Sequence, residues 1–146
     1  DLWAIFEIIT LGEFGNLIST FSVKIRKAIS KDIGLNIAFD SGGKLFENII
    51  FAIKDLRNAI AHNNVIFDTR FKKRNINKTL QKALTSDTNV QDINFNSITD
   101  FVILVIYILK KLKKNNKELT KLINDYLKLI QELKINIPIQ TQVNKL

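Results

Sequence analysis

The 146-residue sequence predicts a single all-α domain, a bundle of about five helices packed through apolar faces. Glycine and proline are rare, at five and one residues, and this usage favours helices over a turn-rich β architecture. Several Ile-, Leu-, Phe- and Lys-rich runs repeat their apolar residues at helical spacing. A hydrophobic content of 46% with 25% charged residues is ordinary for a folded domain and argues against disorder.

The N-terminal part of the chain predicts two helices and a shorter third. A mostly apolar run from Leu2 to Leu11 indicates the first helix, which Gly12 should stop. The second should begin near Glu13, and the spacing i, i+3, i+4 and i+7 marks its buried face: Phe14, Leu17, Ile18 and Phe21. The basic continuation over 23–29 fits a short separate helix, and the glycines at 34 and 42–43 indicate loops.

One long helix is predicted in the centre of the chain, from Lys44 to about His62. Its apolar face follows helical spacing: Phe46, Ile49, Ile50, Ile53, Leu56 and Ile60. Asn63 and Asn64 then supply residues that commonly end a helix. We therefore expect His62 at the C-terminal end of this helix.

The C-terminal half predicts a short helix over 78–84 and two longer ones, after an irregular, basic segment over 63–77. Ser97 and Asp100 have the spacing of a capping box, with the serine on a first-turn amide and the aspartate near the positive helix end. The run 101–109 is apolar on all sides, so its helix should be central or lie in a subunit interface.

The last helix should start near Asn115 or Asn116, and Pro138 should end regular structure. Its apolar residues repeat at helical spacing: Leu119, Leu122, Ile123, Tyr126, Leu129, Ile130 and Leu133. We therefore expect one helical domain over residues 1–133 and a C-terminal tail over 134–146. The chain begins at Asp1 and contains no methionine, so we also expect an N-terminal region to be missing.

The charge balance makes a polyanion the natural partner. The net charge is +8, from 22 Lys and Arg against 14 Asp and Glu, which narrows the partner to nucleic acid or another polyanionic surface. Cysteine is absent, which excludes disulfides and thiolate chemistry and suits the reducing cytoplasm. The most apolar run, 101–109, is well short of the roughly 20 residues that span a bilayer. We therefore expect a cytoplasmic protein without a membrane partner.

The only histidine of the chain, His62, follows Arg57 by five positions. Histidine exchanges a proton near neutral pH, and arginine offers two donors to the non-bridging oxygens of a phosphate. RNA carries its own nucleophile, the 2′-hydroxyl, so these two side chains suit metal-independent RNA cleavage. No cofactor is expected, because Asp55, His62 and Asp68 have the spacing of no standard metal site.

Geometry limits how Arg57 and His62 can act together. Five residues turn an ideal helix by about 140° net, so one straight helix would not point both side chains at one atom. The guanidinium of Arg57 can reach a groove from the edge of the apolar face. A helix end at His62, or a second copy facing the first across a twofold axis, would complete the site. A purely structural role explains the presence of Arg57 and His62 equally well or better, because cationic side chains near a helix C-terminus interact favourably with the helix dipole.

The sequence resembles the Abi-like (abortive infection) family, a branch of the HEPN superfamily. Residues 57–62, Arg-Asn-Ala-Ile-Ala-His, are similar to the superfamily's R-x4-H motif, with the polar Asn58 directly after the arginine. The opening text from Leu2 to Glu7 and from Leu11 to Leu17 resembles the start of the Abi-like helical domain. The resemblance spans most of the chain, from Leu2 to Leu133, although the chain is short for the family.

This resemblance implies a HEPN-like bundle that forms a homodimer with a composite site and acts as an endoribonuclease in anti-phage defence or as a toxin. It assigns phosphate binding to Arg57, general acid or base catalysis to His62 and an orienting role to Asn58. An antitoxin or a regulatory RNA is a further expected partner. The alternative is a non-catalytic RNA-binding or regulatory helical dimerisation module, for example part of a toxin–antitoxin pair.

A basic segment after the motif predicts RNA binding. It surrounds an aromatic ring with cations, which suits phosphate contacts and base stacking on a single strand. With Asn63, the expected RNA-binding residues are Arg70, Phe71, Lys72, Lys73 and Arg74. A solvated basic loop anchored by its phenylalanine fits the same residues.

Overall fold

The computed structural model describes residues 9–61 and 78–136, and residues 1–8, 62–77 and 137–146 lie outside the described part. The helices are α2 (Leu11–Thr20), α3 (Val23–Asp32), the 3₁₀ helix η1 (Ile37–Phe39), α4 (Leu45–Ala61), α5 (Lys78–Thr88), α6 (Ile98–Lys111) and α7 (Asn116–Asn136). The described residues form no strand, which confirms the all-α prediction. They hold six α-helices where about five were predicted for the chain.

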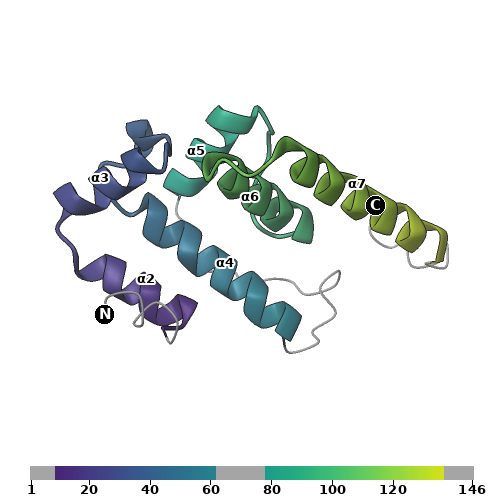
Figure 1. The fold of residues 1–146 in the computed structure, drawn as a ribbon, viewed down its shortest axis with the longest axis horizontal. Helices are drawn as coiled ribbons and strands as arrows, with labels where there is room; N and C mark the ends of the chain where they lie inside the picture. Colours follow the sequence, from purple (N-terminus) through teal and green to yellow (C-terminus); the bar gives the residue numbers. More distant parts are fainter. Residues whose placement is uncertain (1–8, 62–77, 137–146) are drawn as a thin grey trace.

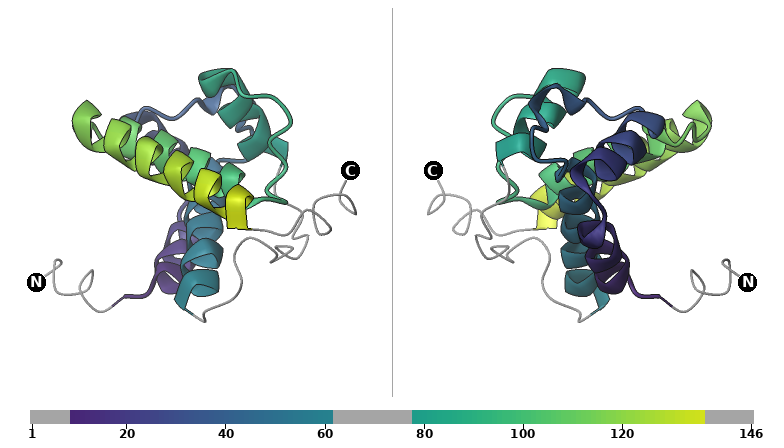
Figure 2. Two further views of the ribbon diagram at one scale, coloured as in Figure 1. Left: turned by 90° about the vertical axis from the view of Figure 1, so that its right-hand side faces the viewer. Right: turned by 90° about the vertical axis from the view of Figure 1, so that its left-hand side faces the viewer.

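The central helix α4 organises the fold (Figure 1). On one side α2 runs antiparallel to it, so that the start of α2 lies beside the C-terminal half of α4. Helices α5 and α6 pack on the other side, and α7 follows α6 and extends away from the rest of the bundle (Figures 1 and 2). The long central helix was predicted to within a residue at its start, and the separate helix predicted from Val23 is confirmed.

Helix α2 begins earlier than predicted, at Leu11. Thr10 is its N-cap: the Thr10 hydroxyl accepts from the Glu13 amide at 3.2 Å, and the Glu13 carboxylate accepts from the Thr10 amide at 2.7 Å. This reciprocal pair is a capping box. Gly12 lies in the first turn of α2 and does not stop a helix, so that prediction was wrong. Of the helix predicted from Leu2 to Leu11, residues 2–8 lie outside the described part, Ile9 and Thr10 are not helical, and Leu11 begins α2.

Two glycines of α2 face α4, and one of them is required for the close approach of the two helices. A Cβ built on Gly15 would stand 2.9 Å from the Cζ atom of Phe51, so only glycine leaves room for this ring. Gly12 lies against the stem of Lys54, where a Cβ would meet the Cδ atom at 3.5 Å, an ordinary contact. Because Gly12 and Gly15 are three residues apart, they share one face of α2. Packing against α4 therefore explains Gly15, whereas Gly12 neither stops a helix nor is required for packing.

The core lies among α4, α5, α6 and the loop before α6. Its buried members include Leu45, Ile49, Leu56, Leu80, Leu84, Phe95, Phe101 and Leu104. The rings of Phe95 and Phe101 meet edge to face, with centroids 5.2 Å apart. The apolar face predicted for the central helix is buried at Ile49, Ile50 and Leu56, whereas Ile60 is 53% exposed. The core therefore thins towards the C-terminal end of α4.

The predicted capping box at the start of α6 is wrong in its bonding. Ser97 occupies the N-cap position, but its side chain makes no capping hydrogen bond. The Asp100 carboxylate instead accepts from the amides of Phe95, at 2.8 Å, and Asn94, at 3.3 Å. These bonds hold the loop where Phe95 has a φ of 58°. Residues other than glycine rarely adopt this left-handed backbone conformation. Asp100 therefore secures the loop that delivers Phe95 to the core.

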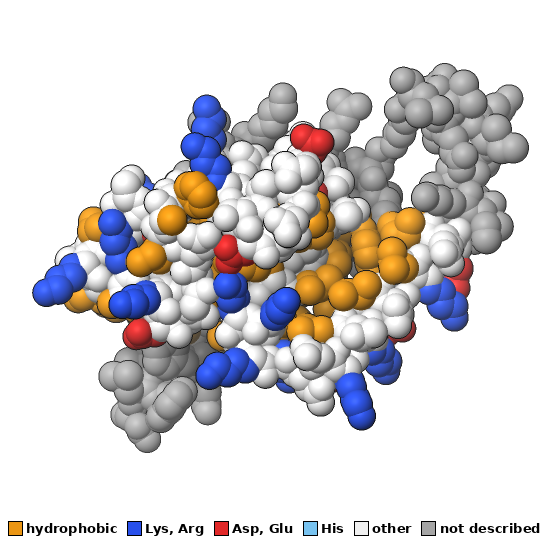
Figure 3. Space-filling model, turned by 90° about the horizontal axis from the view of Figure 1, so that it is seen from above, with side chains coloured by type: hydrophobic (Ala, Val, Ile, Leu, Met, Phe, Trp, Pro, Cys, Tyr) orange, Lys and Arg blue, Asp and Glu red, His pale blue; other side chains and the backbone are white. Residues whose placement is uncertain are grey.

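Helix α6 was predicted to be central or to lie in a subunit interface. In the structure it is central, with Phe101, Leu104 and Tyr107 buried. Helix α7 is not covered in the same way. Only Leu119 of the described α7 side chains is buried, and the more exposed apolar ones are Leu122, Ile123, Leu127 and Leu129. Apolar side chains gather at the surface towards the end of the molecule where α7 lies (Figure 3). Among the described residues, α7 therefore buries only a small part of the apolar face that its spacing predicts.

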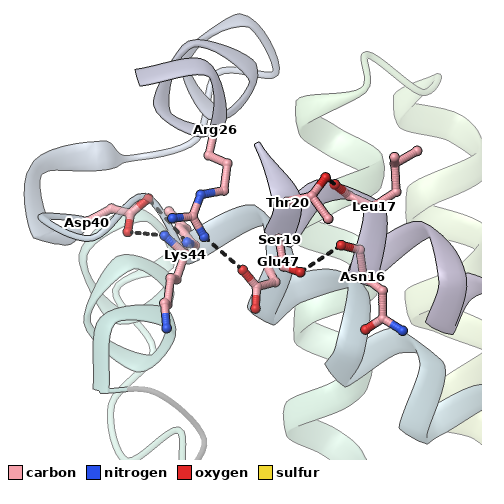
Figure 4. Close-up of polar contacts among 9 residues, drawn as sticks. Asn16, Leu17, Ser19, Thr20, Arg26, Asp40, Lys44 and Glu47 are labelled. Carbon is pink, nitrogen blue, oxygen red and sulfur yellow. Dashed lines mark hydrogen bonds and ion pairs between the residues drawn. The ribbon is translucent and has the colours of Figure 1, made fainter. Parts of the chain in front are cut away.

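Polar groups fix the N-terminal end of α4 (Figure 4). The buried Asp40 carboxylate accepts from the amides of Lys44, at 2.7 Å, and Leu45, at 3.2 Å. Arg26 of α3 pairs with Glu47 at 3.1 Å, and both side chains are largely buried. Capping and ion pairing therefore tie α3 and its following loop to the start of α4.

A second polar cluster joins η1, α5 and α6. Asp87 accepts from the Tyr107 hydroxyl at 3.0 Å and from the Asn36 side chain at 2.9 Å, and its carboxylate lies 2.9 Å from the Lys111 ammonium. Burial acts to raise the pKa of Asp87, but hydrogen bonds from Lys111, Asn36 and Tyr107 outweigh burial and lower it. Burial and the neighbouring Asp87 carboxylate raise the pKa of Tyr107. The phenol therefore stays protonated and donates to Asp87.

Candidate functional site

The predicted site residues Arg57 and Asn58 lie together on the C-terminal half of α4. The Arg57 side chain donates to the Asn58 side-chain oxygen, with Nη1 and Oδ1 at 3.1 Å. Both line a cleft of about 520 Å³ between α4 and the start of α2. Its lining residues are Ile9, Thr10, Leu11, Gly12, Lys54, Arg57 and Asn58. Arg57 is exposed, so its guanidinium remains open to a ligand in this cleft.

The hydrogen bond between Arg57 and Asn58 explains how neighbouring residues can act on one ligand. Adjacent helical residues point about 100° apart, so their side chains do not normally meet. Here the arginine is long enough for its guanidinium to meet Asn58, whose amide oxygen accepts from Nη1 and orients the group. One Asn58 acceptor engages one of the five guanidinium N–H groups, and the remaining donors can face a phosphate.

Lys54 completes a cationic face on α4, and sequence reasoning missed it. Residues 54, 57 and 58 have the spacing i, i+3 and i+4, so they share one helix face. The Lys54 ammonium lies 5.3 Å from the centroid of the Phe51 ring and 3.6 Å from an Asp55 oxygen. The spacing was visible in the sequence, but only the structure shows that α2 covers this face and leaves a cleft over it.

The opposite wall of the cleft is the first turn of α2. The positive end of a helix dipole and the amides of its first turn favour an anion. Glu13 is the acidic residue of this turn, and its carboxylate is engaged in the capping box with Thr10. The backbone hydrogen bond from Thr10 is the main cause that lowers the pKa of Glu13. The cleft thus combines two cationic side chains, one amide side chain and a helix start.

The other predicted site residues lie outside the described part of the chain. They are His62, Asn63, Arg70, Phe71, Lys72, Lys73 and Arg74. The described part of α4 reaches Ala61, the residue before His62, so the predicted helix end at His62 is not tested. Among residues 9–61 and 78–136, no group of three or more His, Cys, Asp or Glu side chains gathers as a metal site would require. Within the same residues, no helix is long and apolar enough to cross a membrane.

The fold and the cleft define an all-helical domain that presents cations between two antiparallel helices. Residues 1–68 match the family model of the Abi-like proteins, so this part of the chain is similar to that family. The matched part contains α2, α3 and α4 and therefore every residue that lines the cleft. No curated protein and no solved structure matches the chain. The family match supports a role in abortive infection.

Proposed function

We propose that this chain is a metal-independent endoribonuclease of an abortive-infection or toxin system, with a HEPN-like fold. The observation that carries the proposal is the cleft in which Arg57, oriented by Asn58, faces open space beside Lys54. The Abi-like match covers the whole cleft and supports the biological setting. The net charge of +8 supports RNA as the substrate.

In the proposed reaction, the RNA 2′-hydroxyl attacks the neighbouring phosphorus, and the bond from phosphorus to the 5′-oxygen of the next nucleotide breaks. A 2′,3′-cyclic phosphate and a free 5′-hydroxyl form. Arg57 stabilises the charge that grows on the non-bridging oxygens, and Asn58 holds the guanidinium in place. His62 takes the proton of the 2′-hydroxyl or gives one to the leaving oxygen.

We propose that two copies of the chain build the active enzyme. Residues 57 and 62 would diverge by about 140° on one straight helix, so a second copy can supply the missing acid or base. The RNA-binding segment, from Arg70 to Arg74 with Asn63, would then guide the strand towards the cleft. An antitoxin or a regulatory RNA would restrain the enzyme.

The test is cleavage of a fluorescent single-stranded RNA in excess chelator by wild type, Arg57→Ala and His62→Ala. Wild type should release fragments with 2′,3′-cyclic phosphate ends, and each variant should lose at least 100-fold in rate, within the typical range for acid–base catalysis. Lys24→Gln, on the exposed side of α3, is the matched control and should cut normally. A strand with 2′-deoxyribose at every position should resist. Intact RNA with wild type, or cleavage by both variants as fast as by wild type, would overturn the proposal.

The exposed apolar side of α7 favours a second candidate function, a helical interaction module without catalysis. Leu127 and Leu129 are 52% and 53% exposed on this helix, and such residues commonly mark a protein interface. This alternative predicts salt-sensitive RNA binding without cleavage, or assembly with a protein partner. Binding that survives His62→Ala, with no product formed by wild type, would favour it.

A further inference from the structure

We infer that Lys54 is an additional RNA-binding residue, which holds the phosphodiester next to the one that Arg57 binds. The inference rests on the proposed endoribonuclease function and extends the site by one nucleotide. Lys54 precedes Arg57 by three residues, and both side chains line the same cleft. Three residues rise about 4.5 Å along a helix, and both side chains are long and flexible, so their charged ends can spread to the separation of adjacent phosphates. Two long cationic side chains at this spacing can therefore reach neighbouring phosphates.

The surroundings of Lys54 direct it into the cleft. Its stem lies against Gly12, and its ammonium lies 5.3 Å from the Phe51 ring centroid. These contacts order the side chain, which is 23% exposed. An ordered cation loses less conformational entropy on binding than a free surface lysine. The Lys54 ammonium is thus already ordered at a place where it can bind an anion.

The acidic neighbour of Lys54 does not prevent this role. The Asp55 oxygen lies 3.6 Å away, and its side chain is 36% exposed. Pairs between partly exposed groups contribute little to stability, so a phosphate can replace the carboxylate as the partner of the ammonium. The acidic Glu13 lies in the first turn of α2, and its carboxylate accepts a hydrogen bond from the Thr10 amide.

The remaining walls of the cleft suit a nucleotide. Ile9 and Leu11 offer apolar surface for a sugar or a base, and Gly12 adds backbone without a side chain to the lining. A volume of about 520 Å³ exceeds what one phosphate group requires. The cleft therefore fits a phosphate together with its nucleoside, and not a free anion alone.

The first experiment counts phosphate contacts by salt dependence. Binding of a non-cleavable 2′-O-methyl octanucleotide is measured by fluorescence anisotropy from 50 to 300 mM salt. Each phosphate contact contributes about 0.7 to the slope of log affinity against log salt for single strands. Lys54→Gln should lower the slope by about that amount and weaken binding roughly fivefold, whereas Lys54→Arg should restore both. Lys24→Gln should match wild type.

The second experiment locates the contact. Chimeric strands carry one ribonucleotide, which sets the cleavage position, and one neutral methylphosphonate at the adjacent 5′ or 3′ linkage. One of these two substrates should raise KM about fivefold for wild type, with kcat nearly unchanged, and should have no further effect on Lys54→Gln. An unchanged salt slope in Lys54→Gln, or independent effects of variant and methylphosphonate, would overturn the inference.

The outcomes also separate the two proposals. If wild type binds RNA with the Lys54-dependent slope but cuts nothing, the endoribonuclease proposal fails. Lys54 then remains a phosphate-binding residue of a site that does not cleave RNA. If wild type cuts RNA and Lys54→Gln keeps the full slope, the enzyme stands and the role of Lys54 fails. Inorganic phosphate that competes as strongly as the octanucleotide would show a free-anion site and would also overturn the inference.

Discussion

The same substitution at two neighbouring glycines of α2 should have opposite effects on stability. At Gly15 a Cβ would stand 2.9 Å from Phe51 Cζ and 3.0 Å from Cε1, where carbon atoms normally keep about 3.5–4.0 Å. The ring or the whole of α2 must therefore move. At Gly12 the nearest side-chain atom is Lys54 Cδ, at 3.5 Å, and nothing needs to move.

The expected magnitudes follow from packing and helix propensity. Overpacking typically costs about 1–3 kcal/mol, and alanine regains about 0.5–1 kcal/mol over glycine in a helix. Gly15→Ala should therefore lower the free energy of unfolding by about 1–2 kcal/mol, and Tm by roughly 3–8 °C for a chain of this size. Gly12→Ala should leave stability unchanged or raise it by about 0.5 kcal/mol, because its position in the first turn reduces the propensity gain.

Urea unfolding followed by circular dichroism measures both variants, and a double-mutant cycle identifies the cause. In Phe51→Leu the ring is gone, so Gly15→Ala in that background should cost at least about 0.5 kcal/mol less than in wild type. Equal stability of Gly15→Ala and Gly12→Ala, or a cycle without coupling, would refute the packing account of this helix pair.

Three further predictions concern the polar contacts. Glu47→Gln should lower the free energy of unfolding by about 2–3 kcal/mol in urea titrations, since it leaves the buried Arg26 guanidinium without a charged partner. Asp100→Ala should cost about 1–2 kcal/mol through lost loop bonds, whereas Ser97→Ala should stay within about 0.5 kcal/mol. The pKa of Asp87 lies below its ordinary value, so its charged form stabilises the fold above the unfolded pKa of about 3.9, and this contribution disappears as pH falls further. Thermal melts should accordingly show Asp87→Asn destabilised at pH 7 and close to wild type near pH 2.

Apolar periodicity predicted most of the described fold, because a helix in a small domain must bury one face. It located α4, α6 and α7 and separated α3 from α2. Periodicity shows that a face is apolar but not what covers it, which is why the exposed side of α7 was missed. Local motifs failed where one residue type serves two purposes. Gly12 looked like a stop and proved to lie in the first turn of α2, and Asp100 had the spacing of a capping box but bonds to loop amides.

The site was predictable only where its residues belong to one helix. Arg57 and Asn58 were selected from the sequence, and both line the cleft. Lys54 was missed because nothing in a single sequence tells which face of α4 another helix will border. That information depends on the approach of α2, which Gly15 permits.

This dependence connects the fold to the proposed chemistry. Arg57 and Lys54 on a bare helix would be two solvated cations, and exposed lysines and arginines on a protein of charge +8 bind any polyanion weakly. Helix α2 changes this by bringing a second wall to the same face, so that the cations act across a confined space in which their field is less screened. Gly15 brings α2 against the ring of Phe51, and that ring in turn supports the Lys54 ammonium. The residue that permits the closest helix contact therefore also positions the cation that we assign to the second phosphate, although it touches neither cation nor ligand.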